Sequence, residues 1–444
     1  MSEVVEQVED LASARPPERR VGVRQAFSAL GHRDFRRFWT GAAVSNIGTW
    51  MQNVTVPYVI LLITGSATWV GIAAFSQLFP TVLLGPVSGY LADRFDRRRL
   101  LILGQGAQAA LSLLVWWAWV AGLRDPRLLV GLLALNGAAF GVTMPSWQAF
   151  VTELVPRRDL LNAVTLNSAQ FNGARAVGPA VGGLVLASFG PSWAFLANAM
   201  SYVTVIVALL LVHPPPRLRA VSERRILGQF ADGLSYVRRH PGLVVAVVTV
   251  GIVFLLGSPI FQLVPVFAER VYRVGPSRYG LLGAAYGIGA VAGAVVLGFV
   301  GDRVRRSRVV VAALVLYGSA LVGMGLVRSY GAGFVLLTVS GLAFLAIIAV
   351  LNTSMQLLVA EHVRGRVIAI YMMTLTGSYP IGALLQGWLT DRIGAPATVL
   401  ISGSLLVLVG LVMAFRPAIP RSLDGHAHRH DPLPDPTVEA DTAL

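Results

Sequence analysis

The chain of 444 residues contains no cysteine and no lysine, and each absence excludes a class of chemistry. Without cysteine there is no disulfide, no iron–sulfur cluster, no thiolate nucleophile and no covalently attached haem. Without lysine there is no Walker A lysine and no Schiff base, so this chain alone is neither a P-loop ATPase nor a retinal protein. All 36 basic residues are arginines, and a GC-rich genome explains this usage more simply than selection for phosphate or lipid contacts.

Charged residues are also scarce. They make up 13% of the chain, about half the share in an ordinary soluble domain, whereas 55% of the residues are hydrophobic. Apolar runs of about 20 residues, each long enough to cross a hydrocarbon core about 30 Å thick, recur along most of the length. The composition therefore predicts an all-α membrane protein with twelve transmembrane helices, which lies in the lipid bilayer.

The apolar runs form two groups of six. We expect a cytoplasmic N-terminal segment over 1–38, a first six-helix bundle over 39–212, a cytoplasmic linker over 213–241, a second bundle over 242–415 and a disordered cytoplasmic tail over 416–444. The linker carries an amphipathic pattern at Ile226, Phe230, Leu234 and Val237.

The arginines give the orientation. A net charge of +14 would suggest nucleic acid for a soluble chain, but here the basic residues gather in alternate connecting segments, so no nucleic-acid partner is expected. With the N-terminus inside, the inner segments hold 28 arginines and the outer segments seven, and Arg175 alone falls within a span. The positive-inside rule therefore predicts that both termini are cytoplasmic.

The two halves repeat each other at an offset of 208 or 209 residues. The pattern Gly89-x-x-x-Asp93-Arg94-x-x-Arg97 returns as Gly298-x-x-x-Asp302-Arg303-x-x-Arg306, and Gln148-x-x-x-x-Glu153 returns as Gln356-x-x-x-x-Glu361. Charged residues repeated in register at the same helix ends seldom coincide by chance. Parallel repeats of six helices imply two bundles with a central pathway between them.

Three motifs together resemble those of the major facilitator superfamily of transporters, and the likeness runs from Phe35 to Phe415. The first is the stretch from Gly89 to Arg98, similar to the loop signature between helices two and three, although Asp96 stands where many members have glycine. The second is Gly173-x-x-x-x-Gly178-Pro179-x-x-Gly182-Gly183 in the fifth helix, which resembles the signature of antiporters. The third, Ser45 to Met51 with Leu62 to Ser66, is similar to the enterobactin exporter-like branch of transmembrane secretion effectors.

The resemblance implies a protein of the bacterial inner membrane with a gate at its inner surface. Asp93 would hold a helix of the opposite bundle while Arg94 and Arg97 bind a carboxylate of the fourth helix, for which Glu153 is the candidate. By the repeat, a second and weaker lock would comprise Gly298, Asp302, Arg303, Arg306 and Glu361. The simpler alternative is that these arginines, Arg98 among them, only fix the topology by reaching lipid headgroups.

Small residues in the fifth helix predict close helix packing. Ala174, Gly178 and Gly182 recur every four residues and form a ridge that another helix can approach. A matching ridge lies in the eighth helix, at Gly280, Gly283, Gly287, Ala290 and Ala294. The packing is either ordinary or a seal that suppresses leakage during outward transport.

Polar residues within the spans predict where a substrate cavity lies. The candidates are Asn46, Trp50, Asn53, Ser168, Asn172, Arg175, Gln262 and Tyr371. Most such residues could equally serve as interhelical hydrogen-bonding groups. Arg175 differs, because a charge at this depth must face protein, water or an anionic ligand.

Together these features predict a monomeric secondary active exporter of a small organic molecule, driven by protons. The carboxylates available for coupling are Asp93, Glu153, Glu269, Asp302, Glu361 and Asp391. An importer or facilitator on the same fold, and a non-transporting membrane sensor, are the alternatives. No catalytic constellation is visible, so we expect no enzyme activity, no cofactor and no metal site.

Overall fold

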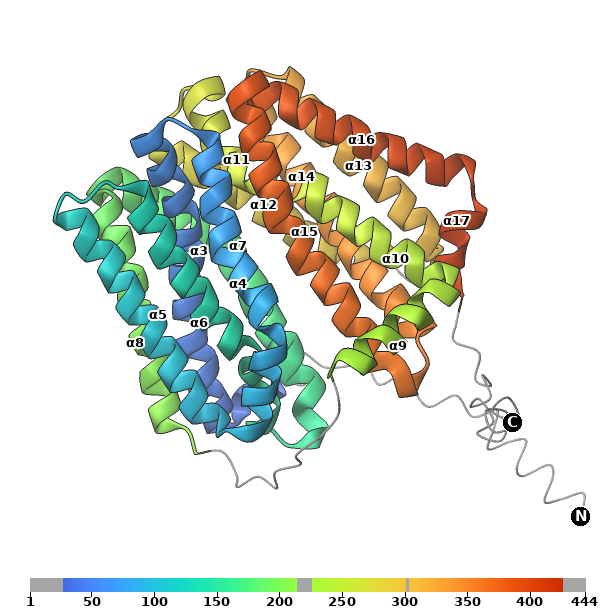
Figure 1. Cartoon of the computed structure of the whole chain (residues 1–444), viewed down its shortest axis with the longest axis horizontal. Coiled ribbons are helices and arrows are strands. Elements are labelled where there is room, and N and C mark those ends of the chain that lie inside the picture. Colours follow the sequence, from blue (N-terminus) through green and yellow to red (C-terminus); the bar gives the residue numbers. More distant parts are fainter. Residues whose placement is uncertain (1–26, 214–225, 301–302, 426–444) are drawn as a thin grey trace, which may run out of the picture.

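The computed structural model describes residues 27–213, 226–300 and 303–425. These residues form helices joined by short turns, with no strand among them. Figure 1 shows two groups of helices, one from each half of the sequence. The fold is that expected from the composition: an all-α membrane protein made of two bundles.

Six long helices make up the first bundle, and their ends coincide with turn-forming residues. Gly65 ends the first helix with a positive φ of 62°, and Pro126 and Pro191 open later helices at positions where an N–H group is not needed. The helices are α3 (Arg33–Thr64), α4 (Ala67–Arg94), α5 (Arg97–Val120), α6 (Pro126–Glu153), α7 (Leu160–Phe189) and α8 (Pro191–Leu211). Short helical turns η1 (Ser28–Gly31) and η2 (Arg157–Asp159) precede α3 and α7.

The second bundle repeats this plan. Its first span runs continuously from Pro241 to Tyr272 and contains two π-helical turns. The elements of that span are α10 (Pro241–Ile252), η3 (Val253–Gly257), α11 (Ile260–Val266) and η4 (Phe267–Tyr272). The remaining spans are α12 (Pro276–Val300), α13 (Arg306–Leu326), α14 (Tyr330–Leu358), α15 (Arg364–Ile393, preceded by η5, Glu361–Val363) and α16 (Ala395–Phe415).

Eleven of these helices are long and apolar enough to cross a membrane. The twelfth long element, α7, has 30 residues but carries Asn167, Gln170, Asn172 and Arg175 along its length. It nevertheless packs between α3 of its own bundle and α12 of the other. The count of twelve spans therefore stays a prediction, and α7 is the helix on which it depends.

The boundaries at the chain ends differ from the expected ones. Helix α3 begins at Arg33 rather than at 39, because its first two turns bury Phe35 and Phe38 against Phe150 while their arginines face outward. The tail expected to be disordered from 416 is ordered up to Gly425, where α17 (Ala418–Arg421) and η6 (Ser422–Asp424) fold back on the second bundle. Residues 426–444, the rest of that segment, lie outside the described residues.

The linker contains a helix, α9 (Ile226–Arg239), at the stretch whose pattern is amphipathic. Val237 is buried, and Gly233 lies against Arg366 and Ile370 of α15. The amphipathic part of the linker therefore packs along the second bundle rather than crossing freely between the two.

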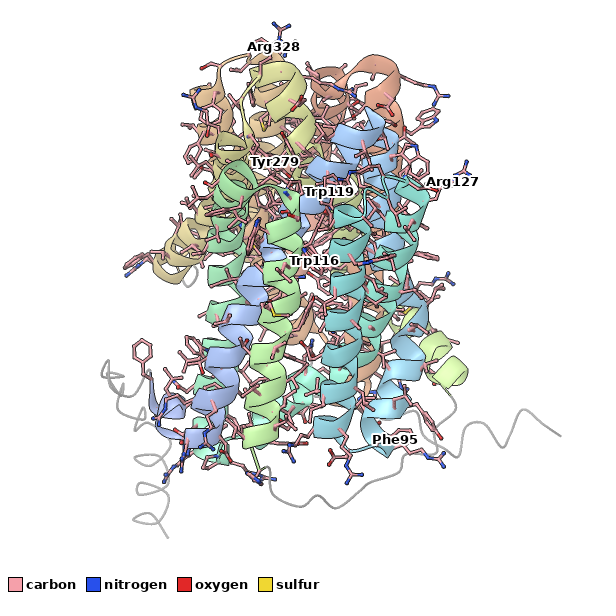
Figure 2. All side chains as sticks on the ribbon, turned by 90° about the vertical axis from the view of Figure 1, so that its left-hand side faces the viewer. Phe95, Trp116, Trp119, Arg127, Tyr279 and Arg328 are labelled. Carbon is pink, nitrogen blue, oxygen red and sulfur yellow. The ribbon has the colours of Figure 1, made fainter. Side chains whose placement is uncertain are left out.

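The two bundles meet through two helix pairs, α4 with α15 and α7 with α12. We call the end of the molecule that carries the α4–α5 turn and Phe95 the linker end, and the end that carries Arg127 and Arg328 the far end (Figure 2). Figure 1 shows α4 and α15 close together near the far end and diverging towards the linker end. The bundles are therefore joined at the far end and separated at the linker end (Figure 1).

Candidate functional site

The far-end junction is built on one carboxylate of the second bundle. Asp391, near the end of α15, accepts hydrogen bonds from the hydroxyl groups of Ser66 (2.5 Å) and Thr68 (2.7 Å). It also accepts from the backbone N–H groups of Ala67 and Thr68, both at 2.8 Å. These two N–H groups open helix α4, so an acid of one bundle caps a helix of the other, where the helix dipole favours negative charge.

Neighbouring contacts strengthen the same junction. Arg270 donates to the carbonyl oxygen of Gly65 at 2.5 Å and lies 3.9 Å from Asp391. A Cβ atom added to Gly71 would lie 2.5 Å from the carbonyl oxygen of Ala383, so the α4 and α15 backbones are in close contact here. The sequence analysis predicts Asp391 only as one of the carboxylates available for proton coupling, and it does not predict the contact with α4.

At the linker end the predicted arginine–carboxylate pair is present in the first half. Arg97 Nη1 lies 2.6 Å from Glu153 Oε1, and the two side chains are 11% and 20% exposed. Arg98 donates to the carbonyl oxygens of Leu209 and Leu210, at 2.5 and 2.7 Å, and so ties the start of α5 to the end of α8. These contacts hold the first bundle together internally.

Other members of the motif take different partners from those expected. Asp93 is 63% exposed and lies 4.0 Å from Arg97 of its own bundle, not against the opposite bundle, because the bundles diverge at this end. Arg94 donates to the hydroxyl group of Tyr90 and stacks over its ring. Asp96, the departure from the family pattern, accepts from the N–H group of Arg99 at 2.8 Å and caps α5.

The structure does not bring the second-half residues together as predicted. Glu361 is 89% exposed and lies 3.8 Å from Arg364. Arg306 instead donates to the carbonyl oxygens of Asp424 and Gly425, because the segment after α16 folds back against the start of α13. Arg303, in the turn that precedes α13, donates to the carbonyl oxygen of Phe299 at the end of α12. Gly298 has open space beside it, and Asp302 lies outside the described residues.

Arg175 lies midway along α7, among aromatic rings of both bundles. Its guanidinium carbon is 5.4 Å from the ring centre of Trp50 in α3, 5.3 Å from that of Tyr286 in α12 and 5.4 Å from that of Phe344 in α14. Its Nε atom is buried and has no hydrogen-bond partner. The charge is stabilised by ring faces, while part of its donor capacity is free to bind an acceptor.

Two more groups continue this aromatic enclosure. Phe261 of α11 lies 5.9 Å from Trp50 across the bundle interface. Gln262 donates to the hydroxyl group of Tyr379 at 3.1 Å, and its own carbonyl oxygen is buried without a partner. Enclosure and unfilled hydrogen-bonding capacity at the meeting of two bundles are features of a ligand site.

Of the other cavity candidates, most have local partners. Asn46 donates to Gln170 at 3.3 Å, and Asn53 accepts from Gln77 at 3.3 Å, so both join helices of the first bundle. Asn172 donates to the carbonyl oxygen of Ser168 on its own helix at 2.9 Å. Tyr371 is fully buried in the core of the second bundle, with its hydroxyl group unpartnered.

The antiporter-type motif packs α7 on two sides. Gly178 and Gly182 face Trp50 and Met51 of α3, so the predicted small-residue ridge contacts α3 rather than α12. The neighbouring face meets α12: a Cβ atom on Gly183 would lie 2.5 Å from the Cα atom of Gly280.

The other two residues of the motif differ in their surroundings. Pro179 is buried within the continuous helix α7, whereas Gly173 has open space beside it.

Sequence reasoning missed the aromatic partners of Arg175. Tyr286 and Phe344 resemble ordinary apolar positions of the second half. The available signal was indirect, since an arginine within a span needs partners on the helices that face it.

Comparison with known proteins places these features in context. The family model described as transmembrane secretion effector matches residues 24–443. The staphyloferrin A transporter of Staphylococcus aureus is 24% identical over 85% of this chain and 95% of its own length. The enterobactin exporter EntS of Citrobacter koseri is 28% identical over 86% and 91%. The macrolide efflux protein A of Streptococcus pyogenes is 24% identical over 85% and 94%.

Solved transporter structures share the fold at low sequence identity. A bacterial homologue of the lysosomal transporter Spinster, in an inward-facing and unoccupied conformation, aligns with a TM-score of 0.69 at 14% identity and covers 90% of this chain and 98% of its own. A bacterial homologue of ferroportin in an inward-facing state gives 0.67 at 17% identity, with 86% and 98% covered.

Proposed function

Because the chain belongs to the family of transmembrane secretion effectors, which have the major facilitator fold, we propose that it exports a small organic molecule from the bacterial cytoplasm by alternating access. It is a multi-pass membrane transporter and not an enzyme. The relatives that match over most of their length are named as an enterobactin exporter, a macrolide efflux protein, a multidrug efflux pump and a staphyloferrin A transporter. A siderophore, an antibiotic or a comparable metabolite is therefore the proposed substrate.

The enclosure around Arg175 is the observation that carries this proposal. It lies midway along the helices, and its walls come from both bundles, so a ligand bound there contacts both at once. A carboxylate, phenolate or carbonyl group on the ligand would accept from the free Nε donor, and the apolar part would lie against the rings. We propose that the substrate combines an oxygen acceptor with an aromatic or apolar body.

The direction of access follows from the arginine distribution. The linker end carries most of the arginines, so we propose that it is the cytoplasmic side and that both termini lie there. Junctions at the far end and separation at the linker end then correspond to a state open to the cytoplasm, from which an exporter takes up its substrate. Cysteine labelling in this Cys-free chain should place positions near Arg98 and Arg305 inside and those near Arg124 and Arg273 outside.

We propose that protons supply the energy by antiport, since the chain has no P-loop lysine with which to use a nucleotide. Everted membrane vesicles from cells that express the protein test this directly. Upon acidification of the lumen they should accumulate erythromycin or a carboxylate siderophore, and a protonophore should abolish the accumulation.

Matched right-side-out vesicles separate export from import. Accumulation only in these vesicles would identify an importer, and accumulation without any gradient a facilitator. Both results contradict the proposal, as does the absence of transport of every siderophore, macrolide and dye tested in either orientation.

A further inference from the structure

A cavity lies at the linker end of the second bundle, away from Arg175. It has a volume of about 870 Å³. Its walls come from α12, α14 and the turn before α13, and its rim includes the ordered tail. The lining residues are Leu297, Gly298, Val304, Ala349, Val350, Thr353, Leu357, Arg305, Arg306, Arg421 and Asp424. The walls are therefore mostly apolar, and three of the four charged groups are arginines.

One of these arginines has a buried donor without a partner. Arg306 Nη2 donates to the carbonyl oxygens of Asp424 (2.8 Å) and Gly425 (3.0 Å). Its Nη1 atom is buried and has no hydrogen-bond partner among the residues that the structure describes. A buried cationic donor is costly to leave unpaired, so this atom marks a position for an acceptor.

The acid that lines the cavity is already engaged. The carboxylate of Asp424 accepts from the backbone N–H group of Ser307 at 2.9 Å and from its hydroxyl group at 2.7 Å, and so caps α13. Arg305 and Arg421, both exposed, add further positive charge. The cavity is therefore positively charged at its rim and apolar along its walls.

We propose that this cavity binds an anionic phospholipid, with the phosphate at Arg305, Arg306 and Arg421 and an acyl chain along Leu297 and Leu357. Candidate membrane helices begin at Arg306 and end at Leu358 beside it, so the cavity lies at the depth of the headgroups on this side. A free phosphate would satisfy the arginines equally but would leave the apolar walls unused.

The remaining segment of the chain, residues 426–444, is the other possible occupant. It carries four acidic residues but also three prolines and few large apolar side chains. A phospholipid fits the apolar walls, whereas this polar segment does not.

Native mass spectrometry of the purified full-length protein tests the proposal. Phosphatidylglycerol should remain bound to the wild type, and phosphatidylcholine should not. The double variant Arg305→Gln/Arg421→Gln, which leaves the Arg306–tail bonds in place, should bind phosphatidylglycerol at least fivefold more weakly, because each basic residue near the headgroup contributes to affinity. Arg308→Gln on the same helix, which does not line the cavity, should bind like the wild type.

Three further results would overturn the lipid assignment. One is equal retention of phosphatidylcholine and phosphatidylglycerol. Another is complete competition by millimolar inorganic phosphate, which would identify a free anion as the ligand. The third is lipid binding that emerges only in the full-length variant Asp431→Asn/Asp435→Asn, which would show that the chain's own acidic segment occupies the cavity.

Discussion

The guanidinium of Arg175 keeps its charge within the bundles, because arginine cannot release its proton under these conditions. Ring faces from three helices, each able to contribute about 0.5–2 kcal/mol, stabilise it without filling its hydrogen-bonding capacity. This free donor capacity is the reason for the proposed role of Arg175 in ligand binding.

We predict that Arg175→Gln weakens substrate affinity about tenfold or more, because the donor to the ligand is lost. The melting temperature should change little, because the neutral amide gives up the ring contacts but also removes the cost of burying a charge. Ligand-induced quenching of tryptophan fluorescence measures the affinity, and Trp50 is a suitable reporter. Arg278→Gln removes a similar stacking contact, with Tyr330 at the far end, and should leave affinity unchanged. A collapse of stability in Arg175→Gln would instead assign the residue to the fold.

The repeat offers a matched test of the Arg97–Glu153 pair. Glu153→Gln removes the carboxylate closest to Arg97 in a mostly buried site and leaves only Asp93, at 4.0 Å. The change should cost about 2 kcal/mol, somewhat less than for a fully buried pair. Glu361→Gln, at the equivalent position of the second half, removes an exposed charge and should cost almost nothing. Equal melting temperatures of the two variants would show that the pair does not stabilise the first bundle.

At the scale of elements, hydrophobic runs predicted the spans but not where polar segments join them. The start of α3 escaped prediction because Phe35 and Phe38 are separated by arginines, so no apolar run marks them. The ordered tail escaped prediction because Asp424 is held by Ser307, a contact over 117 residues that no local pattern reveals. The small-residue motif predicted close packing of α7, but only the geometry shows which face meets α12.

The same motif supplies a prediction with an internal control. Gly183→Leu should separate α7 from α12, because even a Cβ atom there would lie 2.5 Å from Gly280 Cα and 2.8 Å from the carbonyl oxygen of Pro276. Gly173→Leu has open space and should be tolerated. Vesicle transport, with the amount of folded protein measured by size-exclusion chromatography, distinguishes them. Full transport by a folded Gly183→Leu variant would argue against a sealing role for this helix pair.

At the scale of the whole molecule, α4 and α15 form a cross-bundle pair with an aspartate near the C-terminal end of each. Asp391 of α15 caps the N-terminus of α4 at the far end. Asp93 of α4 lies exposed at the linker end, the end at which α15 begins. Among the described residues, Asp93 has no partner in the opposite bundle, because the two bundles are separated at the linker end in this conformation. The sequence alone does not specify which conformation the chain adopts.

We therefore predict that Asp391→Asn shifts the equilibrium about tenfold towards a state open at the far end, because a neutral amide holds the α4 terminus less strongly. Spin labels at positions 123 and 328, one in each bundle at the far end, report the separation of the bundles. The distance between the labels is measured by double electron–electron resonance spectroscopy. Asp125→Asn removes an aspartate that caps a helix within one bundle and should not change the distance distribution. An unchanged distribution in Asp391→Asn would exclude this residue as the far-end lock.

The capping of α4 by Asp391 also limits how fast such a molecule can work. Under the alternating access proposed above, every bond that seals the far end must break once in each round of transport, so a tighter seal slows the opening of that end. Turnover is greatest when neither end holds more firmly than the other. A substitution that weakens the far-end seal can thus raise the transport rate of a variant whose closure at the linker end is already weakened. Substitutions at the two ends would then be recovered as suppressors of one another.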